Sequence, residues 1–140
     1  SGPVGPEFDP TKLEAILDAY ERQGGTTVRG SEAARFAKSQ GGEALYLPAE
    51  GGPGTLIIPS GASRLAVTEE LLHLGQHRGL GWPTSTPLLR AVIEVEAQDA
   101  LLKLARTQRW SAAEVGKITT NRGVWVQDLI NQVAKVRQGG

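Results

Sequence analysis

Strand-like runs in this chain occur only between residues 26 and 58, and the apolar residues on either side recur at helical spacing. The three runs are Thr26–Arg29, Leu45–Leu47 and Leu56–Ile58, which are rich in β-branched and aromatic side chains. Elements therefore follow the order helix, strands and then helices, which predicts an α+β fold rather than regular strand–helix alternation.

Local signals place the element boundaries in the first half of the chain. A helix should begin at Asp9-Pro10, because Asp favours the N-cap and Pro the first helical position, and should end before Gly24-Gly25. We expect Ser31 to cap a second helix that reaches about Lys38. The second and third strand runs should pair as a hairpin, joined by a loose loop from Pro48 to Gly54.

The second half reads as helices only. One helix is expected over about Ser63–Arg78, and the longest should start at Thr86-Pro87 and reach about Gln108, apolar on most sides and therefore central. Ser111 and Glu114 form a capping-box pattern for a further short helix. A final amphipathic helix is expected over Val124–Val136.

Composition fits one globular domain and excludes several classes of protein. Of the 140 residues, 39% are apolar, and 15 basic side chains balance 15 acidic ones, so we expect no nucleic-acid partner. No apolar run is long enough to span a membrane, and the absence of cysteine excludes disulfides and thiolate metal ligands. We expect residues 9–140 to form a single domain and residues 1–8 to be a linker or cloning remnant.

Both histidines of the chain lie in a stretch that also carries two adjacent glutamates, Glu69–Arg78. On a helix, residues four apart share a face, so Glu69, His73 and His77 form one stripe with Glu70 one step around. In the zincin helix, two metal ligands one turn apart bracket a glutamate that activates the attacking water as general base. The pattern predicts Glu69 and His73 as zinc ligands and Glu70 as the base.

A catalytic zinc ion needs a third protein ligand, and the long helix offers candidates. Glu94 is the first choice, Glu96 is the fallback, and His77 is a further alternative. In zincins with a glutamate ligand, an Asp one turn later accepts a hydrogen bond from the first histidine. Here that position is Gln98, whose amide can donate a hydrogen bond to the Glu69 carboxylate where an Asp could not.

These patterns together resemble the zincin-like metallopeptidase toxin domains of bacterial polymorphic toxin systems, over about Leu13–Trp110. The resemblance rests on Ser63–Leu65 leading into Glu69–His73, followed by Glu94–Gln98. It implies a zincin-like fold, with a small strand hairpin or sheet packed on a metal-site helix and a long central helix. It further implies one Zn²⁺ ion, a protein or peptide substrate, a cognate immunity protein, and secretion or delivery into a target cell as part of a larger bacterial protein.

Simpler interpretations exist for the same residues. Glu69 and Glu70 suit the first half of a helix through its dipole, and His77 is expected to be a solvated histidine at the end of that helix. Glu94 has the spacing of an ion pair with Arg90 on a solvated face. The alternatives to a peptidase are a metal-dependent hydrolase of another substrate and a non-catalytic interaction module.

Three further features bear on the substrate. Gln76 and Arg78 could support the metal site or bind a substrate carboxylate, although both also suit a helix surface. Trp82 follows the metal-site helix and could line a substrate cleft. The run Leu56–Ile58 could form an exposed sheet edge that pairs with an extended peptide, or it could be buried.

Overall fold

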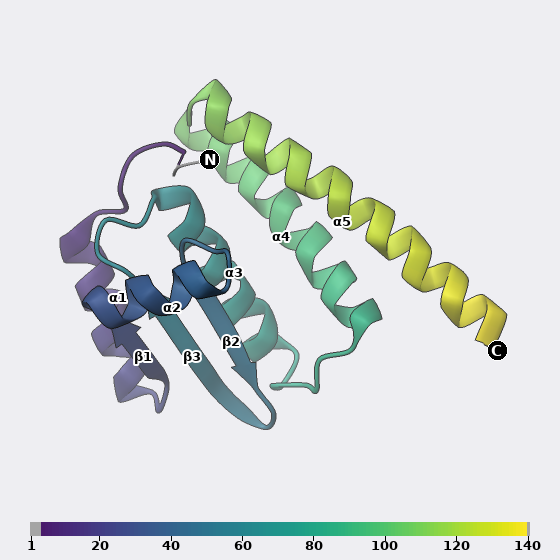
Figure 1. Cartoon of the computed structure of the whole chain (residues 1–140), viewed down its shortest axis with the longest axis horizontal. Coiled ribbons are helices and arrows are strands. Elements are labelled where there is room, and N and C mark those ends of the chain that lie inside the picture. Colours follow the sequence, from purple (N-terminus) through teal and green to yellow (C-terminus); the bar gives the residue numbers. More distant parts are fainter. Residues whose placement is uncertain (1–3, 140) are drawn as a thin grey trace. The chain divides into compact units, whose positions relative to one another are not determined.

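The computed structural model describes residues 4–139, which form an α+β fold of five helices and a small mixed sheet (Figure 1). The chain divides into two compact units, Ser1–Thr84 and Ser85–Gly140. The expectation of one domain over residues 9–140 stays a prediction. The first unit contains α1 (Pro10–Arg22), β1 (Thr26–Arg29), α2 (Gly30–Ser39), β2 (Leu45–Ala49), β3 (Gly52–Ile58) and α3 (Arg64–Gly79); the second contains α4 (Pro87–Gln108) and α5 (Ala112–Gly139).

The sheet has the strand order β1-β3-β2, so β3 is its central strand. It pairs in parallel with β1 and antiparallel with β2, where Tyr46 lies opposite Leu56. Of the two alternatives for Leu56–Ile58, an exposed edge or burial, the structure supports burial, since all three side chains are buried in the central strand. Three consecutive apolar residues indicate a strand that is covered on both faces, which is the environment of β3.

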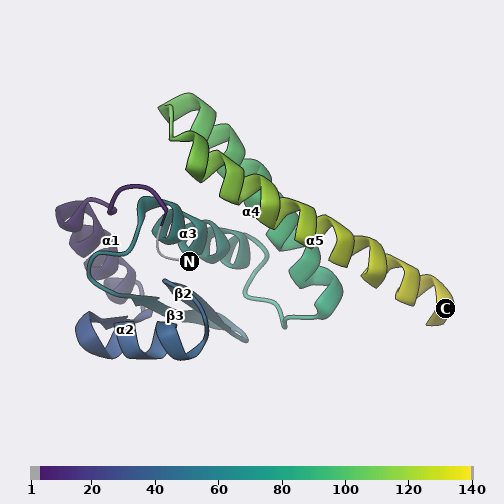
Figure 2. The same cartoon turned by 45° about the horizontal axis from the view of Figure 1, so that its top comes forward.

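Helices cover both faces of this sheet, α1 and α3 on one and α2 on the other (Figure 2). Leu56 and Ile58 point into the main core, which α1 and α3 complete. Ile57 alternates to the opposite face, where the small side chains Ala33 and Ala37 let α2 approach closely. The core of the first unit thus fixes α3 against the sheet.

Polar side chains cap the helices at four of the predicted starts. Asp9 accepts hydrogen bonds from the backbone at the start of α1, Ser63 does so for α3, and Thr86 does so for α4. Ser111 and Glu114 form a reciprocal capping box, in which each side chain accepts from the other residue's backbone N–H. These contacts confirm the predicted helix starts near residues 10, 64, 87 and 112.

The start of α2 differs from the prediction. The helix begins at Gly30, with Arg29 at the N-cap and no side chain acting as cap acceptor, so the prediction that Ser31 caps it is wrong. Arg29 lies at the end of β1 and its guanidinium pairs with three acidic residues of α1. Gly30 has a φ of +67°, which lets the chain turn directly from the strand into the helix.

The hairpin is tighter than expected. Both strands extend into the predicted loop, leaving a short turn between Ala49 and Gly52, with a bulge between Leu47 and Ala49. Gly54 allows this close pairing, because a Cβ atom there would lie 2.1 Å from the Leu47 carbonyl oxygen. The Gly and Pro residues of this segment therefore shape the strands rather than a loose loop.

The second unit is an antiparallel helical hairpin in which α5 is one continuous helix. The prediction of two separate helices after Ser111 is wrong, since Gly116 and Gly123 lie within a helix that packs along α4. Arg122 pairs with Asp99, and the Arg90 guanidinium lies 5.1 Å from the Trp125 ring centroid. None of the helices in residues 4–139 combines the length and apolar character needed to cross a lipid bilayer.

The N-terminal segment contributes to the first unit. Residues 1–3 of the predicted linker lie outside the described part of the chain. Glu7 forms an isolated antiparallel bridge with Ser63, and the Phe8 N–H donates to the Ala62 carbonyl oxygen at 3.0 Å. The Phe8 side chain also packs against the core. Residues 6–8 thus help to hold the segment that leads into α3.

Candidate metal centre

The predicted metal-site residues of the first unit all lie on α3, whose start is firmly anchored. The Ser63 hydroxyl accepts from the Ala66 N–H and donates to Glu43 at 3.1 Å, while the same carboxylate accepts from the Ser63 N–H. Leu65 and Val67 of the first turns are buried. This anchoring fixes the rotation of the helix about its axis, and with it the direction of the glutamate and histidine stripe.

Glu69 and His73 lie one turn apart, as predicted, and both are largely buried. The Glu69 Oε2 and His73 Nε2 atoms are 3.9 Å apart, and the two side chains are 21% and 12% exposed. Two ligand atoms on a tetrahedral zinc ion lie about 3.4 Å apart, given bonds of about 2.1 Å. A rotamer adjustment of about half an ångström would therefore bring this pair to coordination distance.

Gln76 supports the orientation of the histidine. Its Oε1 atom lies 3.0 Å from His73 Nδ1. Metal-binding histidines commonly donate the N–H of the second ring nitrogen to a neighbouring acceptor, which fixes the ring and directs the other nitrogen at the metal. Gln76 is therefore in the place of such an acceptor, which fits the interpretation that it supports the site.

Glu70, the predicted general base, contacts the sheet. Its Oε1 atom accepts a hydrogen bond of 2.8 Å from the Tyr46 N–H in edge strand β2. Tyr46 is only 8% exposed, and the Glu70 carboxylate is the hydrogen-bond acceptor for its backbone N–H. The carboxylate thus has a structural role that fixes its position beside the Glu69–His73 pair, with one oxygen committed to the strand.

His77 is buried, at 5% exposed, so the prediction of a solvated histidine is wrong. Its Nδ1 atom lies 2.7 Å from the Tyr46 hydroxyl and its Nε2 atom 3.2 Å from the Pro83 carbonyl oxygen. Only one tautomer satisfies both contacts: Tyr46 donates to Nδ1, and Nε2–H donates to Pro83. Because both ring nitrogens are used in this way, His77 acts as a structural link between the hairpin and residue 83.

The hydroxyl of Tyr46 belongs to a longer chain of buried hydrogen bonds. It accepts from the Gly54 N–H at 3.3 Å, and the Tyr20 hydroxyl donates to the Gly54 carbonyl oxygen at 2.6 Å. Burial, together with the neighbouring Tyr46, raises the pKa of Tyr20 to about 12, and burial also raises the pKa of Tyr46. The network joins α1, the hairpin and α3 and keeps both phenols protonated.

Trp82, expected as a possible cleft residue, packs against this network. Its ring lies edge-on to the His77 ring, with centroids 5.0 Å apart, and the Arg78 guanidinium lies 5.9 Å from its centroid. The Trp82 carbonyl oxygen also accepts from the Gly51 N–H in the hairpin turn. These contacts give Trp82 a packing role in the first unit.

The candidate third ligands lie on α4, in the second unit. Glu94 is partly buried, whereas Glu96 is exposed, which favours Glu94 of the two. Gln98, one turn after Glu94, is fully buried. The assignment of Glu94 as the third ligand stays a prediction, and so does the role of Gln98 behind Glu69.

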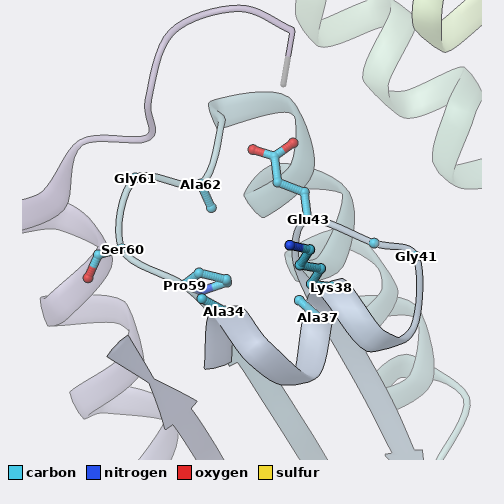
Figure 3. Close-up of a pocket in the computed structure, with 10 residues that line it drawn as sticks. Ala34, Ala37, Lys38, Gly41, Glu43, Pro59, Ser60, Gly61 and Ala62 are labelled. Atoms are coloured by element: carbon cyan, nitrogen blue, oxygen red, sulfur yellow. The ribbon is translucent and has the colours of Figure 1, made fainter. Parts of the chain in front are cut away.

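A pocket of about 440 Å³ lies elsewhere in the first unit, between the end of α2 and the segment after β3 (Figure 3). Ala34, Ala37 and Pro59 give it an apolar lining, and Lys38 and Glu43 contribute the charged groups. None of the predicted site residues lines it. The carboxylate of Glu43 already holds the start of α3 through Ser63.

Two residues that hold α3 in place, Tyr46 and Glu43, were not identified from the sequence. Tyr46 contacts Glu70 and His77, which are 24 and 31 residues away, and Glu43 contacts Ser63 across 20 residues. Periodicity and capping rules describe neighbours within a few residues, so no such signal could identify these partners. The only indirect indication was the expectation that the strand hairpin, which contains Tyr46, packs on the metal-site helix.

Comparison of the chain with protein-family models, with curated proteins and with solved structures gives no match. The chemistry of α3 is therefore inferred from its own side chains.

Proposed function

We propose that this chain is a zinc-dependent peptidase in which Glu69, His73 and Glu94 hold the ion and Glu70 is the general base. The observation that supports it most directly is the Glu69–His73 pair, two largely buried ligand-type side chains whose ligand atoms are 3.9 Å apart. Gln76 lies against the second ring nitrogen of His73, as an acceptor beside a metal-binding histidine would. A neutral imidazole and two carboxylates are suitable donors for zinc.

The chain's own residues would divide the chemistry between them. A bound zinc ion supplies Lewis acidity, which polarises a peptide carbonyl and makes a water molecule more acidic. Glu70 removes a proton from the attacking water and later delivers it to the departing amine nitrogen. The hydrogen bond from the Tyr46 N–H to Oε1 of Glu70 holds this carboxylate in place for the proton transfer.

The wider setting of this proposal comes from the resemblance in sequence. We assign the chain a zincin-like fold and the role of a C-terminal toxic effector domain in a larger secreted bacterial protein, with a peptide or protein substrate and a cognate immunity protein. Support comes from the spacing within Glu69–His73 and from Glu94 and Gln98 on the following helix. The helix–strand–helix order of the first unit agrees with that assignment at the level of fold class.

A second candidate function is a non-catalytic interaction module. The observation that favours it is the hydrogen bond from Tyr46 N–H to Glu70, which gives this glutamate a structural reason to be present. In that case Glu69 and His73 would be an ordinary pair of residues on one helix face, and the protein would bind no stoichiometric metal.

Metal content distinguishes the two functions. Protein purified without chelator is analysed by elemental mass spectrometry and titrated with zinc, using the wild type, His73→Ala, Glu94→Gln and Glu96→Gln. Glu96→Gln is the matched control, since it removes the same charge from an exposed position two residues from Glu94. We expect about one zinc ion per chain in the wild type and control, none in His73→Ala, and at least about tenfold weaker binding in Glu94→Gln.

Two results would contradict the proposal in different ways. Equal zinc binding by Glu94→Gln and Glu96→Gln would remove Glu94 from the ligand set. No zinc in the wild type after zinc is added back would refute the metal site and leave the interaction module.

A further inference from the structure

We propose that α5 pairs in antiparallel orientation with α5 of a second copy of this chain, through an exposed stripe that α4 leaves uncovered. The stripe consists of eight residues of α5 spaced alternately four and three apart: Ala112, Gly116, Thr119, Gly123, Val126, Ile130, Val133 and Arg137. This is the a and d spacing of a coiled coil, which places the residues along one face of the helix. Only the last of them is charged, so the stripe is suited to contact with another protein surface.

α4 packs against a different face of α5 (Figure 1). The buried side chain of Ile118 marks that face, and Thr119, the next residue, lies about 100° further around the helix. All residues of the stripe are exposed except Val126, which is partly buried. Ile130 is 56% exposed and Val133 is 39% exposed. The stripe is thus a second apolar face on a helix whose first face is already covered.

The two glycines of the stripe leave the backbone of α5 uncovered at two places. A Cβ atom at Gly116 or Gly123 would meet open space, so packing among residues 4–139 does not require glycine at either position. Glycine is also unfavourable in the interior of a helix, where it usually has a packing or functional reason. Close approach of a second helix to this face supplies that reason.

The order of small and large residues along the stripe favours a second copy as the partner. The glycines lie in its first half, and the exposed β-branched apolar residues lie in its second half. An antiparallel pair with its two-fold axis between Val124 and Trp125 combines one small and one large residue in each layer. In these layers Gly116 faces Val133, Thr119 faces Ile130, and Gly123 faces Val126 of the second copy. A parallel pair would place glycine against glycine and leave gaps between the helices.

The size of the stripe predicts a reversible dimer. Residues 112–137 form about 39 Å of helix with a diameter of about 11 Å. If the second helix covers roughly a third of this cylinder, about 450 Å² is buried on each copy, or about 900 Å² in total. Specific interfaces begin near about 1,000 Å² in total, so we expect a dissociation constant of about 10–100 µM.

The first test measures association of the full chain by sedimentation velocity, at concentrations from about 5 to about 500 µM. We expect a monomer at the lowest concentration and a dimer at the highest. Ile130→Lys places an unpaired charge in two layers of the pair and should raise the dissociation constant at least about tenfold. Val124→Lys is the matched control, since it adds the same charge to an exposed residue of the same helix outside the stripe, and it should associate as the wild type does.

Both substituted positions are exposed in the single copy, so circular dichroism should show an unchanged helix content in both variants. A wild type that stays monomeric over the whole range would overturn the inference. Equal association of Ile130→Lys and Val124→Lys would overturn it as well.

The second test determines the orientation of the two helices. The chain contains no cysteine, so a single cysteine can be introduced at a chosen position. Antiparallel pairing brings residue 119 next to residue 130 of the second copy and separates the two copies of residue 119 by about 16 Å along the helix. A short bismaleimide reagent should therefore link a mixture of Thr119→Cys and Ile130→Cys chains faster than either variant alone. Faster linking of each variant to itself would refute the antiparallel arrangement.

Discussion

Glu70 combines a proposed catalytic role with a contact to the sheet, and two substitutions separate them. Glu70→Ala removes both the base and the acceptor for the Tyr46 N–H. Glu70→Gln removes the base, yet its amide oxygen can still accept from the same N–H. A comparison of the two variants therefore measures the structural contact independently of the chemistry.

The size of the stability effect follows from the burial of Tyr46. Tyr46 is only 8% exposed as a whole residue, and a hydrogen bond to a charged acceptor such as the Glu70 carboxylate contributes about 1.5–3 kcal/mol. We therefore expect Glu70→Ala to lower the free energy of unfolding by about 2 kcal/mol. Glu70→Gln exchanges a charged acceptor for a neutral one and should cost less than about 1 kcal/mol.

Two assays read out the two roles. Urea denaturation followed by tryptophan fluorescence gives the midpoint and slope for each variant, and Trp82 reports on the unit that contains Glu70. Cleavage of a degenerate peptide pool by zinc-loaded protein gives activity, which should fall by about 10²-fold or more in both variants. Unfolding of Glu70→Ala at the wild-type midpoint would refute the structural role of Glu70, and cleavage of the pool by Glu70→Gln at the wild-type rate would refute its role as the base.

Two other predictions concern the same buried network and the hairpin. The pKa of Tyr20 is raised from 10.0 to about 12, and that of Tyr46 is raised as well, so the folded protein should show little tyrosinate absorbance at pH 10. The raised pKa of Tyr20 contributes about 3 kcal/mol to the free energy of unfolding, which is present below pH 10 and is lost as the pH rises towards 12. Ionisation of half of the tyrosine side chains at pH 10, as for free phenols, would contradict this prediction. Gly54→Ala places a Cβ atom 2.1 Å from the Leu47 carbonyl oxygen and should lower the free energy of unfolding, measured by urea denaturation, by at least about 2 kcal/mol. Gly52→Ala is the control in the same strand: its Cβ atom would meet open space, so the free energy of unfolding should change by no more than about 0.5 kcal/mol. Equal effects of the two substitutions would show that the strand shifts without cost.

Sequence patterns predicted most of the local structure because the signals themselves are local. Asp9 and Ser63 cap their helices by accepting hydrogen bonds from backbone N–H groups two or three residues away, so the local sequence is enough to locate the starts of α1 and α3. Ser31 does not cap α2 because the helix already begins at Gly30, directly after Arg29, which ends a strand and is tied to the acidic face of α1. That constraint is tertiary and has no trace in the residues around position 31.

In the candidate site, too, the sequence predicted the local spacing of the residues but not their distant partners. The spacing of Glu69 and His73 placed both on one face of α3, and the structure agrees. His77 has the same spacing from His73, but Tyr46 and Pro83 take both of its ring nitrogens. A helical repeat thus identifies which residues share a face, whereas burial and distant partners decide which of them remain suited to bind a ligand.

The contact between Glu70 and Tyr46 also bears on how the molecule behaves at high concentration. An edge strand exposes backbone donors to which a second molecule can add a strand, and such pairing leads to aggregation. In β2, the Tyr46 N–H is occupied by Glu70, and Pro48, at the bulge, has no N–H to offer. The side chain proposed as the base thus also closes this edge of the sheet, so Glu70→Ala should favour edge-to-edge association while Glu70→Gln keeps the edge closed.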